Sequence, residues 1–242
     1  MPDELFSHPR LAPIYDHFEG DRADLEHYRR LAAKLGARSV LDIGCGTGAL
    51  ALLLAADGLV VTAVDPAEAS LTEAQAKPGA EGVRWIHGDA TAVGPLNVDL
   101  AVMTGNVAQV FVTDNDWEAT LSGIATAVEP GGHLVFETRD PAKRAWERWT
   151  AEHTRRTEQV DGAGLVTTWL DLDEVALPLV RFRATYRFES DGETIVSTST
   201  LRFREQHELA ATLDRQGFDV VEVRDAPDRP GLEWVFVAKR RP

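Results

Sequence analysis

One stretch, Val40–Gly48 (V-L-D-I-G-C-G-T-G), constrains the fold more than any other part of the chain. An apolar run over Ser39–Ile43 ends at three glycines in alternate positions, and an alanine- and leucine-rich segment, Ala49–Ala56, follows at once. This order predicts a buried strand, a tight glycine turn and a helix packed on the strand. Because glycine has no Cβ, the backbone can turn sharply and a ligand can lie against it. The unpaired N–H groups at the start of the helix face the same space, so the stretch indicates a nucleotide-binding turn.

The spacing of the glycines distinguishes two kinds of nucleotide site. A dinucleotide-binding turn has the pattern G-x-G-x-x-G, whereas here Gly44, Gly46 and Gly48 alternate with other residues and Asp42 lies inside the strand before them. The stretch resembles the first motif of class I methyltransferases, which bind S-adenosylmethionine (SAM). That resemblance implies that the three glycines form part of a SAM site. A glycine turn without a ligand and an NAD-dependent oxidoreductase remain as alternatives.

Acidic residues follow the next two predicted strands. Leu59–Val64 is predicted as a strand ending at Asp65, whose side chain can accept hydrogen bonds from ribose hydroxyls. Val83–His87 is predicted as a third strand and is followed by a Gly-Asp-Ala turn. In the methyltransferases that the first motif resembles, an acidic residue here binds the adenine amino group and the next backbone N–H binds a ring nitrogen. The resemblance therefore assigns Asp65, Asp89 and Ala90 to the cofactor site.

Strands and helices alternate up to residue 138. Strands are predicted at Val98–Met103 and His133–Thr138, with a helix over Trp117–Val128 and a Pro130-Gly131-Gly132 turn between them. The elements predicted near the C-terminus are a helix over Glu205–Gln216 and strands over Phe218–Arg224 and Glu233–Lys239. The alternation predicts an α/β fold, with a mostly parallel sheet and helices on both faces. As class I methyltransferases imply, the sheet should have seven strands with the last one antiparallel.

Two segments lie outside this alternation. From Leu165 to Arg204 polar residues alternate with apolar or aromatic ones, and Asp191-Gly192 marks a turn between two such runs. This predicts an antiparallel sheet of about three strands, in an insertion over about residues 150–204 that follows strand five and shapes the substrate pocket. Residues 1–36 are predicted as a helical cap, broken near Gly20, over the mouth of the cofactor site. We expect residues 1–242 to form a single domain.

Three small pieces are similar to the glycine N-methyltransferase branch of the class I enzymes. They are Gly20-Asp21 with Arg22 in the cap, Gly105-Asn106 after the fourth strand, and Arg139 after the fifth. In that branch the arginine holds the substrate carboxylate and the asparagine lies beside it. The resemblance thus implies that Asn106 and Arg139 line the acceptor site, and that the acceptor is an amine bearing an anionic group. An ion pair of Arg139 with Asp140 or Glu137 is the structural alternative.

Three further residues are assigned to the cofactor site. Tyr15 and Arg22 place an aromatic ring and a cation in the predicted cap, where an ordinary amphipathic helix is the alternative. Thr104 directly follows the fourth strand, and open α/β sheets bind ligands outside the carboxyl ends of their strands. We therefore expect these side chains to lie near the glycine turn.

Charge limits the partners of the protein. The formal net charge of −14 repels nucleic acid and anionic membranes. After the fourth strand the chain has Thr-Gly-Asn instead of the Asn-Pro-Pro-aromatic box of nucleic-acid amino methyltransferases. We therefore expect a small-molecule methyl acceptor and no nucleic-acid or membrane partner. The N-terminal residues do not resemble a signal peptide and the apolar runs are too short to span a membrane, so we expect a cytoplasmic protein.

No catalytic side chain can be named from the sequence. Methyl transfer is an in-line displacement for which the cofactor supplies the activation, and positioning alone can supply ~7–11 kcal/mol. The seven histidines form no H-x-x-x-H or H-E-x-x-H pair, so we expect no metal. Cys45, the single cysteine, is expected to be a packing residue. A SAM-binding protein without catalysis remains an alternative, and the sequence does not define the oligomeric state.

Overall fold

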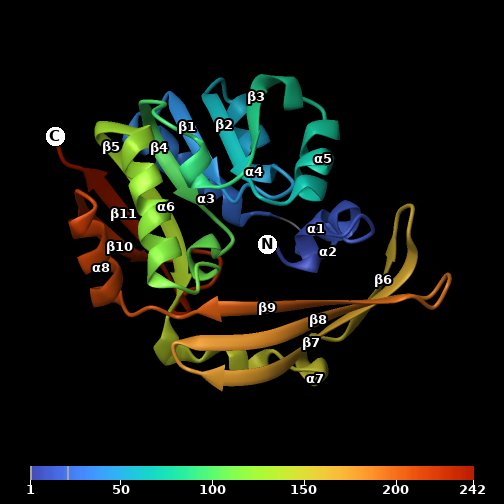
Figure 1. Ribbon diagram of the computed structural model, residues 1–242. Coiled ribbons are helices and arrows are strands. Elements are labelled where there is room, and N and C mark those ends of the chain that lie inside the picture. The colour runs from blue at the N-terminus through green and yellow to red at the C-terminus, as the bar shows by residue number, and fades with distance from the viewer. Residues whose placement is uncertain (1, 21) are drawn as a thin grey trace.

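The computed structural model of the protein describes residues 2–20 and 22–242 and contains two sheets. The strands of the larger sheet are β1 (Ser39–Ile43), β2 (Val60–Asp65), β3 (Val83–His87), β4 (Val98–Met103), β5 (Val128–Arg139), β10 (Phe218–Asp225) and β11 (Glu233–Arg240). They lie in the order β10-β11-β5-β4-β1-β2-β3 (Figure 1). The pairs from β5 to β3 are parallel, whereas β11 is antiparallel to both of its neighbours. The seven-stranded, mostly parallel sheet predicted from the sequence is confirmed.

Helices cover both faces of this sheet because its strands are buried on both sides. On β1, Leu41 and Ile43 enter one hydrophobic core and Val40 enters the other. Helices α6 (Asp114–Ala127) and α8 (Gln206–Arg215) complete the first core, and helices α3 (Asp24–Leu35) and α4 (Ala49–Ala56) complete the second. Helix α5 (Glu68–Ala76) lies beside β2 and β3. None of the helices in the described part of the chain is long and apolar enough to cross a membrane.

The second sheet is formed by the segment between β5 and α8, as the sequence predicts. Its strands are β6 (Arg156–Val160), β7 (Gly164–Ala176), β8 (Leu179–Phe188) and β9 (Thr194–Arg202), all antiparallel, and the short helix α7 (Ala151–Thr154) precedes them. The prediction of about three strands misses β6. The reason is that β6 is short and mostly exposed, so it lacks the alternation of apolar and polar residues that marks the other strands.

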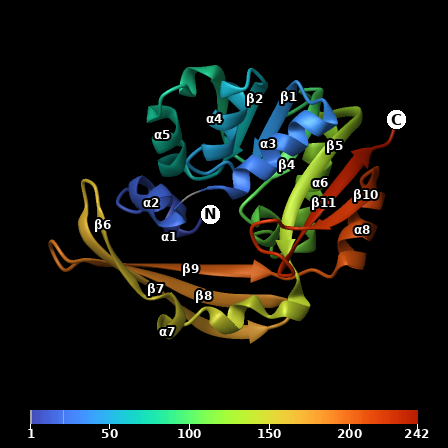
Figure 2. The ribbon, with the colours of Figure 1, turned by 180° about the vertical axis from the view of Figure 1, so that it is seen from behind.

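The N-terminal segment lies between the two sheets (Figure 2). It consists of α1 (Glu4–Ser7), the 3₁₀ turn η1 (Ala12–Ile14) and α2 (Tyr15–Glu19). Leu11, Ile14 and Phe18 pack against the second sheet, where they contact residues such as Tyr186 and Phe188. The predicted cap over residues 1–36 therefore comprises two parts, this N-terminal segment and helix α3. Helix α3 packs on the larger sheet, because its apolar stripe is long enough to be buried there.

The start of β5 differs from the prediction. Val128 pairs with Val98 of β4, and His133 pairs with Leu100, so the residues between them form a bulge within the bounds of β5. The Pro-Gly-Gly sequence belongs to this bulge instead of to a turn before the strand. A Cβ on Gly132 would lie 2.9 Å from the carbonyl oxygen of Asp99, so glycine permits the close approach of the two strands.

Candidate functional site

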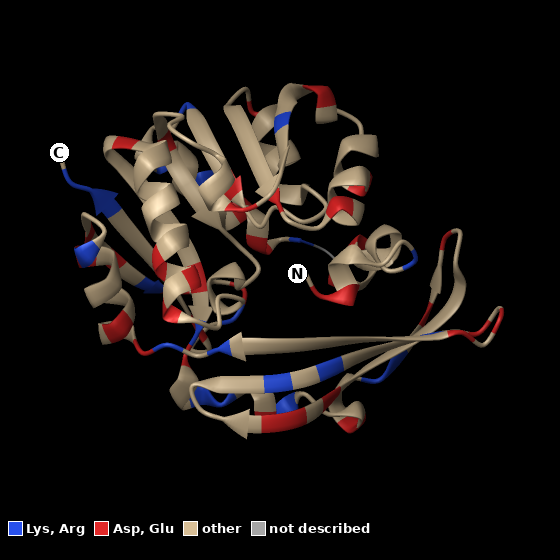
Figure 3. Ribbon diagram, viewed as in Figure 1, with Lys and Arg blue, Asp and Glu red and all other residues tan. Residues whose placement is uncertain are grey.

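A cavity of about 450 Å³ lies at the carboxyl ends of the parallel strands. Its wall includes the residues that follow β1, β2, β3 and β4, together with parts of the N-terminal segment and of β9. Figure 3 shows acidic residues at these strand ends, where the larger sheet faces the N-terminal segment. The predicted residues found on the wall are Tyr15, Arg22, Gly44, Gly46, Asp65, Asp89, Ala90 and Thr104. The structure therefore brings together most of the predicted cofactor residues at the edge where open sheets bind ligands.

The three glycines of the turn have different surroundings, although each has a positive φ. A Cβ on Gly44 would lie 2.6 Å from the side chain of Val107, and one on Gly48 would lie 2.5 Å from the ring of Trp85. A Cβ on Gly46 would meet no atom within 4 Å. Gly48 is absent from the cavity wall, and the lack of a Cβ there lets the turn approach Trp85. Its contact with the cofactor stays a prediction. Of the three glycines, only Gly46 has free space on the side where a Cβ would lie.

Asp65 supports the glycine turn as well as facing the cavity. Its Oδ2 accepts a hydrogen bond from the Gly46 N–H at 2.8 Å, and its Oδ1 accepts one from the Ala67 N–H at 2.8 Å. Burial raises the pKa of Asp65, and these two hydrogen bonds act in the opposite direction. Since each carboxylate oxygen can accept a second hydrogen bond, ribose hydroxyls can still bind there. The predicted ribose contact stays a prediction.

Asp89 shapes the turn after β3. Its Oδ1 accepts hydrogen bonds from the N–H and the hydroxyl of Thr91, which caps the 3₁₀ turn η3 (Ala90–Ala92). Helix α6 packs closely on this turn, because a Cβ on Gly123 would lie 2.5 Å from the Ala90 carbonyl oxygen. The turn is therefore held from two sides. The adenine contact assigned to Asp89 and Ala90 remains untested.

Asp42 is the residue whose role the sequence left unassigned. It lies on β1, lines the cavity and is only 1% exposed. Neither of its carboxylate oxygens has a hydrogen-bond partner among the described residues. Burial, with a smaller effect of the nearby Asp65 charge, raises the pKa of Asp42 to about 7. An unpaired buried carboxylate is costly, so this wall is suited to a ligand that brings positive charge or hydrogen-bond donors.

The N-terminal segment is fastened to the glycine turn. The Asp16 carboxylate accepts hydrogen bonds from the Thr47 hydroxyl and from Lys77, and Lys77 Nζ also donates to the Thr47 carbonyl oxygen at 2.7 Å. Beyond this contact, the Tyr15 ring lies 5.5 Å from that of Phe6. The predicted cap residues are therefore held over the cavity.

Arg22, the other predicted cap residue, already has a partner. Its guanidinium makes a two-point ion pair with Asp24, at 3.0 and 2.9 Å. Asp21, which belongs to the same predicted motif, lies outside the described residues.

Asn106 and Arg139 were predicted to line the acceptor site, but neither lies on the cavity wall. Asn106 Nδ2 donates to Glu233 at 3.1 Å, and its backbone N–H donates to Glu137 at 3.1 Å. Arg139 pairs with Glu233 at 3.4 Å and donates to Gln109 at 2.9 Å. The reason is register: Glu233 of β11 lies directly opposite Arg139 of β5. Arg139 thus pairs across the sheet instead of with an acidic neighbour in sequence.

These contacts form a buried polar cluster beside the cavity. Its members are Tyr28, Asn106, Glu137, Arg139 and Glu233, and the exposed Arg229 pairs with Glu233 from the surface. The Tyr28 hydroxyl donates to Glu137, and Arg229 donates to Glu233 at 2.8 Å. Burial raises the pKa of Glu137, while the Tyr28 hydrogen bond lowers it. The cluster satisfies its carboxylates within the protein and fixes the Gly-Asn turn after β4.

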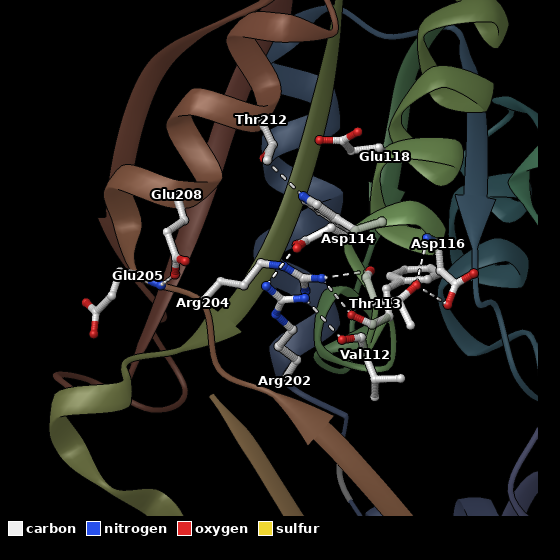
Figure 4. A network of polar contacts seen from close by, with 12 residues as sticks. Val112, Thr113, Asp114, Asp116, Glu118, Arg202, Arg204, Glu205, Glu208 and Thr212 are labelled. Carbon is white, nitrogen blue, oxygen red and sulfur yellow. Dashed lines mark hydrogen bonds and ion pairs between the residues drawn. The ribbon is translucent and has the colours of Figure 1, made fainter. Parts of the chain in front are cut away.

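Two arginines at the end of the second sheet hold the loop that follows this turn (Figure 4). Arg204 donates to the Phe111 carbonyl oxygen at 2.7 Å, and Arg202 donates to that of Val112 at 3.1 Å and pairs with Asp114 at 2.8 Å. Burial lowers the pKa of Arg204 to about 10. The inserted sheet therefore positions one wall of the cavity, where Phe111 lies. No local sequence signal indicates this role, because the contacts are between distant segments.

Comparisons with known sequences match part of the chain to methyltransferases. Residues 40–132 match a family described as a methyltransferase domain. An uncharacterised methyltransferase of Mycobacterium tuberculosis is 36% identical over 104 residues, which is 43% of this chain and 52% of the relative. The cypemycin N-terminal methyltransferase of Streptomyces is 34% identical over 110 residues, 45% of each protein. The chain thus spans about half the length of these curated relatives.

Solved structures resemble nearly the whole chain. The CcbJ methyltransferase of Streptomyces caelestis is 21% identical, with a TM-score of 0.78 over 96% of both chains. The sugar N-methyltransferase KedS8 of Streptoalloteichus is 21% identical, with a TM-score of 0.77 over 94% of this chain and 93% of that one. The SAM-bound amino pentose methyltransferase CalS10 of Micromonospora echinaspora is 19% identical, with a TM-score of 0.70 over 94% and 96%. The chain has the Rossmann-like fold of these methyltransferases, and its match to the methyltransferase domain covers residues 40–132.

Proposed function

We propose that the protein transfers a methyl group from SAM to a small-molecule acceptor. The proposal rests on two features of the wall of one cavity. Gly46 has free space where a Cβ would lie, and the buried Asp42 carboxylate has no hydrogen-bond partner among the described residues. A glycine turn that only joined a strand to a helix would need neither feature. The family match supports the proposal because residues 40–132 contain both residues as well as Asp65 and Asp89.

The charge of the cavity suits SAM, which carries a sulfonium and an ammonium group. The charged residues on the described part of the wall are Asp3, Arg22, Asp42, Asp65, Asp89 and Asp116. Their excess of carboxylates favours a positively charged ligand. In this assignment the Gly46 backbone lies against the cofactor, Asp65 binds the ribose hydroxyls, and Asp89 and Ala90 bind the adenine.

The contribution of the chain to the reaction is positioning and exclusion of water. When bound, SAM supplies a methyl group activated by the sulfonium. The Arg202 and Arg204 contacts fix the loop that carries Phe111, and the Asp16 contacts fix the segment that carries Tyr15. Both aromatic side chains line the cavity and reduce its contact with water. Holding two reactants in a near-attack arrangement can supply ~7–11 kcal/mol without a covalent catalyst.

We take the methylated atom to be an amine nitrogen. The acidic wall supports this, and so do the printed names of the structural neighbours, of which KedS8 is a sugar N-methyltransferase and CalS10 acts on an amino pentose. The anionic group predicted from Asn106 and Arg139 is not part of this proposal, because both side chains bind within the buried polar cluster. Membership of the glycine N-methyltransferase branch stays a prediction.

Calorimetric titration followed by a methyl-release assay tests the proposal. SAM should bind and NAD should not, and label from methyl-labelled SAM should pass to at least one member of a panel of small amines. Binding of SAM with no transfer to any amine or alcohol in the panel would instead support a SAM-binding protein without catalysis. Binding of NAD in place of SAM would contradict the proposal.

A further inference from the structure

The inserted sheet contacts both the N-terminal segment and the loop that follows β4. The Ser199 hydroxyl of β9 donates a hydrogen bond to Asp3, and residues just beyond β9 bind the loop of residues 107–113. Val107, at the start of this loop, lies on the cavity wall. Its side chain occupies the space where a Cβ of Gly44 would lie, so the loop packs directly on the first glycine of the turn. Because closely packed groups move together, the position of the loop affects the glycine turn.

Arg204, which follows β9, binds three backbone carbonyl groups of this loop (Figure 4). Its Nη1 donates to the Ala108 carbonyl oxygen at 3.3 Å, and its Nη2 donates to those of Phe111 at 2.7 Å and Thr113 at 3.4 Å. Ala108 directly follows Val107 in the chain. The guanidinium therefore holds the neighbour of the residue that packs on the glycine turn.

The surroundings of Arg204 are unfavourable for a cation. The residue is 3% exposed, its Nε has no hydrogen-bond partner among the described residues, and Asp114 forms an ion pair with the neighbouring Arg202 instead. Arg204 also precedes Glu205, the N-cap of α8, and the dipole at this end of a helix disfavours positive charge. The ring of Trp117, 5.1 Å away, compensates only part of this cost.

The stability of the fold does not explain an arginine at this position. A buried charge without an ionic partner contributes little to stability, and an apolar side chain of similar volume is often as good or better. The contacts that only a guanidinium supplies here are the parallel hydrogen bonds to several carbonyl oxygens. The position of the loop is therefore what the arginine provides.

We propose that Arg204 is a positioning residue of the cofactor site, holding the loop after β4 on the glycine turn; this inference rests on the proposed function. The effect passes from the guanidinium to Ala108, and then through Val107 to Gly44. The sequence predicts that the insertion shapes the substrate pocket, and this contact gives the insertion a role in SAM binding as well. Without the contact, the loop can move away from the turn and a bound ligand should dissociate faster.

Two substitutions of Arg204 and one control test the inference. Arg204→Met removes the donors and keeps a long side chain, whereas Arg204→Lys keeps the charge but replaces the planar fork with a compact ammonium. Arg215→Met is the matched control, because Arg215 is a cation of α8 that pairs with Glu118 of α6 and not with the loop. Hydrogen–deuterium exchange of the ligand-free proteins is measured by mass spectrometry. The dissociation rate of S-adenosylhomocysteine is measured by displacement with excess SAM.

The exchange of the glycine turn gives the decisive measurement. The N–H groups of Gly44, Gly46 and Gly48 all donate hydrogen bonds, so their exchange reports on the order of the turn. Arg204→Met should accelerate exchange in residues 107–113 and 44–48, and the dissociation of S-adenosylhomocysteine, by about tenfold or more, since a hydrogen bond from a charged group is worth that much. Arg204→Lys should give smaller increases, and it replaces Arg204→Met in the test if that variant does not fold. Arg215→Met should give none.

Unchanged exchange at the glycine turn would overturn the inference even if the loop exchanges faster, because Arg204 would then order the loop alone. An unchanged dissociation rate of S-adenosylhomocysteine would overturn it as well. Binding of S-adenosylhomocysteine to the unaltered protein reports on the proposed function separately. If that binding is absent, the proposed function fails, and exchange at the turn still decides whether Arg204 positions it.

Discussion

Two buried carboxylates at the same edge of the larger sheet have opposite surroundings. Asp42 on β1 is 1% exposed and Glu137 on β5 is 5% exposed. Glu137 accepts hydrogen bonds from the Tyr28 hydroxyl and the Asn106 N–H, whereas neither oxygen of Asp42 has a described partner. Burial raises the pKa of both. Proteins rarely leave buried polar groups unpaired, so the difference separates a group that completes the fold from one that a ligand completes.

The glycines of the turn show the same difference. The space where a Cβ would lie is occupied by Val107 at Gly44 and by Trp85 at Gly48, whereas it is empty at Gly46. Substitutions of Gly44 or Gly48 should therefore reduce stability, and substitutions of Gly46 should reduce ligand affinity. This division can be tested residue by residue.

Removing the Glu137 carboxylate should have the largest effect. Glu137→Ala should lower the free energy of unfolding by about 3–5 kcal/mol, because it leaves buried donors unpaired and removes a negative charge from a cluster that contains Arg139. Urea denaturation measures this change. A loss below about 1 kcal/mol would show that the cluster does not complete the fold, since that is the size of one ordinary hydrogen bond.

A side chain on the open glycine should affect binding instead. Gly46→Leu should weaken SAM by about a hundredfold or more, equivalent to about 2.7 kcal/mol, because it fills the space against which the ligand lies. Gly36→Leu is the control. Gly36 also has a positive φ and free space where a Cβ would lie, but it follows α3 and is absent from the cavity wall. Calorimetry should show unchanged SAM affinity for Gly36→Leu. Undiminished affinity in Gly46→Leu would contradict the assignment of the site.

Substitutions of Asp65 and Asp89 should affect both stability and SAM affinity, since each side chain also makes hydrogen bonds within the protein. Loss of one hydrogen-bonding partner of a buried ligand group costs ~1–3 kcal/mol, so Asp65→Ala should weaken SAM by roughly ten- to a hundredfold. Asp65→Asn retains one acceptor oxygen for the turn and should have a smaller effect. An unchanged dissociation constant would remove Asp65 from the ligand site, and the same measurement on Asp89→Ala tests the adenine contact.

A dependence of stability on pH is also expected. The pKa of Asp42 is raised from its ordinary value to about 7, so the native state retains this proton over a range in which the unfolded chain has lost it. The contribution of Asp42 to stability should therefore fall as pH rises from about 4 to about 7, by on the order of 1 kcal/mol per pKa unit. Asp42→Asn should lack this fall, so without ligand it should be more stable than the unaltered protein at pH 8.

Denaturation of both proteins across this pH range, with the ligand-free form, measures the difference. Parallel curves for the two proteins would show that Asp42 is ionised normally in the native state. The same substitution should weaken SAM at pH 8, so stability and affinity should change in opposite directions.

The sequence predicted the parts of the fold that depend on local pattern. Strands β1, β3 and β4 have the predicted bounds, because each is followed directly by a glycine or a threonine that ends the extended segment. Eight of the nine residues assigned to the cofactor lie on the cavity wall, since they occupy the ends of parallel strands or the cap. Gly48 is the exception, and its packing against Trp85 depends on how α4 meets β3.

The missed features depend on pairing between distant segments. The partner of Arg139 is set by the register of β5 with β11, and that of Asp3 is set by the place of β9 under the N-terminal segment. Neither register has a local signature. The unpaired state of Asp42 could be suspected from a carboxylate inside an apolar strand, but only the structure shows that its oxygens have no hydrogen-bond partner among the described residues.

The hydrogen bonds from Arg202 and Arg204 to the loop after β4 affect which substitutions this loop can tolerate during evolution. Arg202 and Arg204 bind the carbonyl oxygens of Ala108, Phe111, Val112 and Thr113, which every amino acid possesses. The path of the loop is therefore independent of the side chains that it carries. Val110 and Phe111, which line the cavity, can be replaced in the course of evolution while the backbone that presents them stays in place. Under the proposed function, single substitutions in this loop are expected to change which acceptor binds.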